Sequence, residues 1–65
     1  MQPHQERVVT EANELREKLL KLVQFIGTNP AFIALDSVDQ ALLREQRDHM
    51  IRYLDVLDMR IERFA

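Results

Sequence analysis

Residues that end helices occur at one place in the interior of this chain. The stretch IGTNPAFIALDSVDQ, residues 26–40, holds the only glycine, Gly27, and one of the two prolines, Pro30. Glycine readily adopts the left-handed conformation that closes a helix, and proline cannot continue the ladder of helical hydrogen bonds. The chain is therefore divided into two long segments, and the fold depends on what each segment forms.

Both segments repeat apolar residues at intervals of three and four, which is the spacing of one face of an α-helix. In the first segment the repeating residues are Val8, Ala12, Leu15, Leu19, Leu22 and Ile26. In the second segment, with one polar step at Gln46 or Arg47, they are Leu43, Met50, Leu54, Leu57, Ile61 and Phe64. The pattern predicts a helix over about residues 4–26, a connector over 27–37 and a second helix over about 38–64.

The residues at the ends of the two segments favour the same bounds. Pro3 suits the first turn of a helix, where a backbone donor is not needed. We expect Gly27 to close the first helix near Ile26. Ser37 and Gln40 form the S-x-x-Q pattern of a capping box, which predicts the start of the second helix.

The connector is unusually apolar, because it carries Phe32, Ile33 and Leu35. A plain surface loop is polar, since backbone outside secondary structure is hydrated. We expect these three residues to form one helical turn that plugs the open end of the two-helix unit. The alternative is an exposed apolar tip used for docking.

Two helices of similar length joined by about ten residues form an antiparallel hairpin. A chain of 65 residues is short for a stable core, and without cysteine it has no disulfide to supplement that core. A second apolar row flanks each helical seam. We therefore predict an all-α hairpin with a short helical turn at its tip that pairs as a homodimer into a four-helix bundle; a monomer is the alternative. The predicted dimer interface consists of Val9, Leu20, Val23, Leu42, His49, Tyr53 and Val56.

Composition and charge argue against several classes of protein. Charged residues make up 31% of the chain but the formal net charge is only -2, so a nucleic-acid-binding protein with a basic face is not expected. The hydrophobic fraction of 46% argues against disorder. No window contains the roughly 18 apolar residues of a membrane span. We expect a soluble, cytoplasmic protein.

No group of residues has the spacing of a catalytic or metal site. His49 and Glu45 lie one helical turn apart, a spacing that could support metal binding or a general base. A zinc centre needs three or four ligands, however, and two residues do not make a site. We therefore expect no enzyme activity, no cofactor and no metal.

One side of the second helix carries a row of acidic residues around an isoleucine. The row is either a solvated face or a surface for a basic partner, in which Ile51 would be the apolar anchor. The residues of this predicted partner-binding surface are Asp48, Ile51, Asp55, Asp58 and Glu62.

The chain resembles the small helical-hairpin proteins of tailed bacteriophages. The resemblance extends from Glu6 to Phe64 and follows the patterns E-R-V-x-x-E-x-x-E-L, K-L-x-x-F-I, L-x-x-x-x-Q-x-L-L-x-x-Q and M-x-x-Y-x-x-x-L-x-x-R-I. The last pattern is the most distinctive. The matching residues are Glu6, Arg7, Val8, Glu11, Glu14, Leu15, Lys21, Leu22, Phe25, Ile26, Leu35, Gln40, Leu42, Leu43, Gln46, Met50, Tyr53, Leu57, Arg60 and Ile61.

The resemblance implies a phage accessory protein that acts on a host protein in the bacterial cytoplasm. A similar member of that group is an anti-activator, which binds a LuxR-type quorum-sensing regulator and also a pilus-assembly ATPase. By analogy, this chain would inhibit a host regulator by presenting acidic and apolar side chains to a basic surface. Its partners would be a second copy of itself and that regulator, with no direct nucleic-acid or membrane binding.

Two other functions stay open under the same resemblance. Some phage helical-hairpin proteins sequester cyclic nucleotide immune signals in pockets between subunits, which would make this chain an anti-defence protein. That function needs cations and stacking groups, for which His49, Tyr53 and three arginines are candidates. The possible anion contacts are Arg16, Arg47 and Arg52. The third possibility is a structural oligomerisation module.

Overall fold

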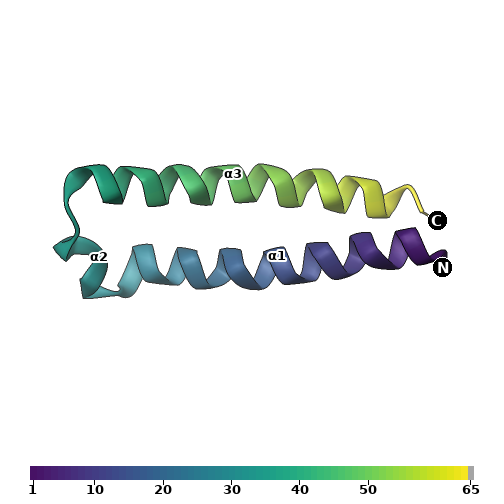
Figure 1. Ribbon diagram of the computed structural model, residues 1–65, viewed down its shortest axis with the longest axis horizontal. Coiled ribbons are helices and arrows are strands. Elements are labelled where there is room, and N and C mark those ends of the chain that lie inside the picture. Colours follow the sequence, from purple (N-terminus) through teal and green to yellow (C-terminus); the bar gives the residue numbers. More distant parts are fainter. Residues whose placement is uncertain (65) are drawn as a thin grey trace.

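The computed structural model describes residues 1–64, which form three helices and no strand. Helix α1 spans Pro3–Thr28, α2 spans Pro30–Ala34 and α3 spans Ser37–Glu62. Helices α1 and α3 lie side by side and run antiparallel, while α2 forms the turn between them and both termini lie at the opposite end (Figure 1). The prediction of an all-α fold is confirmed.

The end of α1 differs from the prediction. The helix continues through Gly27 to Thr28, and no described residue has a positive φ, so the expected left-handed conformation at Gly27 is wrong. Asn29 ends the helix instead, with φ -89° and ψ 121°, and its amide donates to the carbonyl of Phe25 at 3.2 Å. The reason is Pro30, which excludes the helical conformation from the residue before it.

The start of α3 is capped by Asp36 and not by Ser37. The Asp36 carboxylate accepts a hydrogen bond from the amide of Asp39 at 2.9 Å, so the predicted capping box is wrong. Aspartate is as good a cap as serine, and with Asp36 in that position Ser37 becomes the first helical residue. The side-chain amide of Gln40 donates to the carbonyl of Leu35 at 2.9 Å and so ties α3 to the turn before it.

The core is a narrow seam between α1 and α3. Its buried residues are Val8, Ala12, Leu54 and Leu57, and the half-buried Leu15, Leu19, Ile61 and Phe64 pack against them. The predicted seam is confirmed, because every one of its twelve apolar residues is buried or half-buried. The half-buried ones are Leu15, Leu19, Leu22, Ile26, Leu43, Met50, Ile61 and Phe64.

The tip of the hairpin has a small core of its own. Phe32 is 3% exposed, and its ring meets that of Phe25 edge-on, with 6.1 Å between centroids and 84° between planes. The Arg44 guanidinium lies 5.1 Å from the Phe32 ring centroid. The predicted plug is therefore confirmed for Phe32, and Leu35 is half-buried. It is wrong for Ile33, which is 78% exposed, because a single turn directs only one of two adjacent residues inward.

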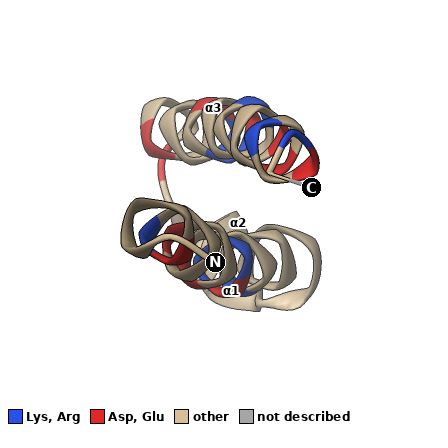
Figure 2. Cartoon of the chain, turned by 90° about the vertical axis from the view of Figure 1, so that its right-hand side faces the viewer, with Lys and Arg blue, Asp and Glu red and all other residues tan. Residues whose placement is uncertain are grey.

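The hairpin leaves much of its surface uncovered. It measures 45 × 15 × 14 Å and exposes 5096 Å² of surface. A compact monomer of 7.7 kDa is expected to expose about 4300 Å². Seen along the rod from the termini, the two long helices form two layers, one helix thick each (Figure 2). A rod this thin cannot enclose a second apolar row on either helix.

Candidate binding faces

Two contacts between α1 and α3 mark opposite sides of the hairpin. The Arg16 guanidinium holds the Asp58 carboxylate through two bonds, at 3.0 and 3.3 Å. The Tyr53 hydroxyl donates to the Glu11 carboxylate. At about 100° per residue, Arg16 and Glu11 lie about 140° apart around α1, and Asp58 and Tyr53 lie about 140° apart around α3. The two contacts therefore flank the core on its two sides.

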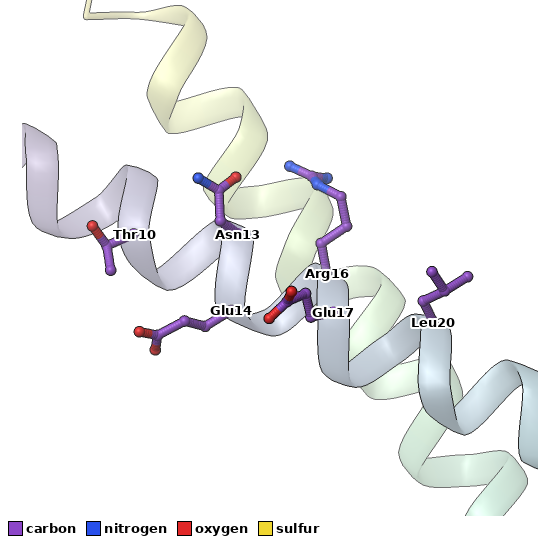
Figure 3. A pocket seen from close by; sticks show the side chains of 6 residues that line it. All are labelled: Thr10, Asn13, Glu14, Arg16, Glu17 and Leu20. Atoms are coloured by element: carbon purple, nitrogen blue, oxygen red, sulfur yellow. The ribbon is translucent and has the colours of Figure 1, made fainter.

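The Arg16 face is the side marked by the contact between Arg16 and Asp58. Helix α1 places the exposed Leu20 and Val23 on it, and Figure 3 shows Arg16 and Leu20 projecting from the same side of α1. Val23 follows Arg16 by seven residues on α1 and Ile51 precedes Asp58 by seven on α3, so both lie on the side of the hairpin that carries this ion pair. By helical spacing, the residues of this face are Val9, Arg16, Leu20, Val23, Asp48, Ile51, Asp55, Asp58 and Glu62.

The Arg16 face contains the whole surface predicted to bind a basic partner. Its acidic residues and Ile51 lie on one side of α3, as the sequence predicted. Two of the four carboxylates already have arginine partners, because Asp58 contacts Arg16 and Asp48 accepts from Arg47 at 3.0 Å. Asp55 and Glu62 are the carboxylates of this row with no ion pair within residues 1–64.

The Tyr53 face is the side marked by the contact between Tyr53 and Glu11. Helix α3 exposes the apolar side chains of Leu42, Tyr53 and Val56 there, with His49 between them and its Nε2 atom 3.5 Å from the Glu45 carboxylate. Helix α1 adds two acidic and two basic side chains. By helical spacing, the residues of this face and its edge are Glu11, Glu14, Lys18, Lys21, Leu42, Glu45, His49, Arg52, Tyr53 and Val56.

The predicted dimer interface is divided between the two faces. Val9, Leu20 and Val23 belong to the Arg16 face. The α3 members belong to the Tyr53 face, and they are Leu42, His49, Tyr53 and Val56. The seven-residue interface stays a prediction, but a second copy packed against one side of the hairpin contacts only one of these groups.

The three predicted anion contacts differ in their surroundings. Arg16 is engaged by Asp58 and Arg47 by Asp48. Arg52 makes no ion pair within residues 1–64. Lys18 and Lys21, which were not among the predicted anion contacts, share the Tyr53 face and also make no ion pair in the described part of the chain. The signal for them was present, since Lys18 lies seven residues after Glu11 on one stripe of α1.

Two hollows on the surface of residues 1–64 are open to solvent. A shallow hollow on the outer side of α1, shown in Figure 3, is lined by Thr10, Asn13, Glu14, Arg16, Glu17 and Leu20. A second one lies near the tip, at Lys21 and Phe25. Among residues 1–64 no three His, Asp or Glu side chains converge as metal ligands, and no helix has the length and apolarity to cross a membrane.

The ion pair between Arg16 and Asp58 is expected to add little to stability. Its side chains are 50% and 42% exposed, and exposed pairs contribute about 0.2–1 kcal/mol. Urea unfolding of Arg16→Gln, Asp58→Asn and the double variant should give a coupling energy below about 1 kcal/mol. A coupling of about 2 kcal/mol or more would mean that this contact holds the two helices in register.

Comparison with known proteins identifies one family. A family model described as Sequestin matches residues 2–63. No curated protein matches the chain, and no solved structure matches it. The matched range includes all three helices and therefore both faces.

Proposed function

The chain belongs to the Sequestin family, and from that membership we propose that it acts by sequestration. It binds a small anionic signal, specifically a cyclic nucleotide, and keeps the signal from the receptor that would respond to it. The match over residues 2–63 carries this proposal, because the family's name describes a sequestering role. Sequestration requires binding alone, so no catalytic step, metal or cofactor is part of it.

The Tyr53 face has the side chains that such a ligand needs. The exposed ring of Tyr53 can stack on a base, and the Arg52 guanidinium can form paired hydrogen bonds with a phosphate. Arg52 is suited to this because no carboxylate within residues 1–64 holds it. By contrast, Arg16 and Arg47 would have to give up Asp58 and Asp48 before they could bind phosphate.

A tight site requires more than one hairpin. Sites for small ligands cover most of the ligand surface, whereas the hollows on this hairpin are open to solvent. We therefore place the nucleotide between two copies, where Tyr53, His49 and Arg52 of each copy can contact it. Phosphates held by arginines and bases held by tyrosines would then be shielded from water.

The acidic Arg16 face offers a surface for a different partner. Its acidic residues and Ile51 would suit a basic protein surface, as the anti-activator hypothesis requires. The LuxR-type regulator and the pilus-assembly ATPase depend on the phage resemblance alone, and the Sequestin match adds nothing to that hypothesis. No observation favours a purely structural module.

Calorimetric titration with a panel of nucleotides tests the proposal. Cyclic di- and trinucleotides should release or absorb heat on binding, and their linear counterparts should bind at least about 10-fold more weakly, since linear chains lose more freedom. Arg52→Ala should weaken binding about 10-fold to 100-fold, the loss of one or two hydrogen bonds to a charged group. Arg16→Ala, on the opposite face, should change the affinity less than about 2-fold.

Two further results bear on this experiment. The titration is run at a protein concentration at which Arg52→Ala has the same mass in solution as the wild type, so that any lost affinity reflects the lost contact with the ligand. Absence of heat with every cyclic nucleotide would contradict the proposal. If a purified LuxR-type regulator then bound the chain, the anti-activator hypothesis would replace it.

A further inference from the structure

We propose that the Tyr53 face binds a second copy of this chain, with the two α3 helices antiparallel across a two-fold axis that passes beside His49. A two-fold interface pairs each residue with its symmetry counterpart, so the surface must complement itself after reversal. The sequence on this face meets that condition on both helices.

On α3 the reversal about His49 pairs apolar with apolar and acid with base. Leu42 and Val56 each lie seven residues from His49, so Leu42 of one copy meets Val56 of the other. At the edge of the face, Glu45 lies four residues before His49 and Arg52 lies three residues after it. Reversal brings Glu45 opposite Tyr53 of the second copy, one residue from its Arg52, so without a bound ligand each glutamate lies beside an arginine of the second copy.

On α1 the same reversal pairs two glutamates with two lysines. Reversal about position 16 exchanges Glu11 with Lys21 and Glu14 with Lys18. One half of this stripe is acidic and the other half basic, so an antiparallel second copy matches opposite charges along it. Lys18 and Lys21 make no ion pair within residues 1–64, which leaves both available for this contact.

The centres of the two patterns lie at the same height along the rod. Helices α1 and α3 have 26 residues each and lie antiparallel along their length, so Pro3 lies at the same end as Glu62 and Thr28 at the same end as Ser37 (Figure 1), and position 16 of α1 comes level with His49. Both positions also fall at the middle of their helices, Pro3–Thr28 and Ser37–Glu62, so two copies would overlap along their full length.

The uncovered surface has the size that a dimer needs. The hairpin exposes 5096 Å², which exceeds the area expected of a compact monomer by about 800 Å². A standard protein interface buries about 800 Å² of each partner. The excess area of one hairpin therefore matches the area that a second copy would cover.

The Arg16 face fits a second copy less well. Reversal about Ile51 would also pair arginines with aspartates there, but Arg16 holds Asp58, Arg47 holds Asp48 and Arg44 lies on the Phe32 ring. Those partners would have to be given up. On the Tyr53 face, by contrast, the cations of Lys18, Lys21 and Arg52 make no ion pair within residues 1–64.

A charge-swap experiment by analytical ultracentrifugation, without nucleotide, tests this interface independently of the sequestering role. The wild type should sediment with twice the protomer mass of 7.7 kDa. Arg52→Glu places glutamates beside glutamates and should raise the dimer dissociation constant about 10-fold or more. Combining Glu45→Arg with Arg52→Glu restores the pairing and should bring that constant back to within about 3-fold of the wild type. The second swap, Glu14→Lys with Lys18→Glu, should behave in the same way on α1.

The control variant is Leu20→Asp, on the Arg16 face, which should leave the mass unchanged. All of these residues are exposed, and circular dichroism should show unchanged helix content in each variant. A wild type that stays monomeric at high concentration would overturn the proposal. So would a single swap that the double variant does not rescue, or a dimer that Leu20→Asp breaks and Arg52→Glu leaves intact.

Discussion

Leu57→Ala is expected to lower the free energy of unfolding by about 2–5 kcal/mol, the cost of emptying a well-packed leucine site. Leu57 is 1% exposed and is the largest fully buried side chain of the hairpin. It packs in the seam with Val8, Ala12 and Leu54. A hairpin with so few buried residues has little stability to spare, so this one change removes a large fraction of it. Urea unfolding followed by circular dichroism measures the loss.

Leu20→Ala is the matched control, because it makes the same chemical change at a site that is 58% exposed. Its expected effect is within about 0.5 kcal/mol of zero. Both variants should be measured at two protein concentrations, since association stabilises the folded state by mass action. An equal loss in both variants would show that the seam between α1 and α3 is not the main source of stability.

The seam itself could be predicted because it depends on local spacing. A helix that repeats apolar residues at three and four has one apolar side wherever it packs. Two such helices joined by about ten residues can bury those sides only against each other. All twelve predicted seam residues, from Val8 on α1 to Phe64 after α3, are accordingly buried or half-buried.

The helix ends could be predicted only to within a few residues, because neighbouring residues compete for the same role. Asp36 and Ser37 are adjacent and both are good caps, so the sequence does not decide between them. Gly27 permits a left-handed conformation but does not require one. Pro30 makes a left-handed conformation at Gly27 unnecessary, because Asn29, the residue before this proline, must leave the helical region in any case.

The two faces could not be predicted from helical projections of single helices. Such a projection places Leu20 beside the seam of α1 and Tyr53 beside the seam of α3, but it does not say whether they share a side. That depends on how the two helices are rotated relative to each other, which the contacts of Arg16 with Asp58 and of Tyr53 with Glu11 show. Both contacts join residues 42 positions apart, for which the sequence has no local signal.

Phe32→Ala is expected to cost about 3–5 kcal/mol and to loosen the tip before the rest of the hairpin. Phe32 is 3% exposed and is the buried residue of α2. The change also removes the edge-on contact with Phe25 and the Arg44 guanidinium above the ring, each worth about 0.5–1.5 kcal/mol. Phe32→Leu keeps an apolar side chain in the site and leaves a smaller cavity. It should therefore lower the free energy of unfolding less than Phe32→Ala does.

Ile33→Ala provides the comparison on the same helical turn, because Ile33 is 78% exposed. It should change the free energy of unfolding by less than about 0.5 kcal/mol. Amide hydrogen exchange locates the damage, since opening of a local unit speeds exchange only within it. In Phe32→Ala, exchange should accelerate around Asn29, Leu35 and Gln40, while amides beside Ala12 and Leu54 keep most of their protection. If Ile33→Ala destabilises the chain as much as Phe32→Ala, then Ile33 is covered in solution, and the tip is a binding surface and not only a plug.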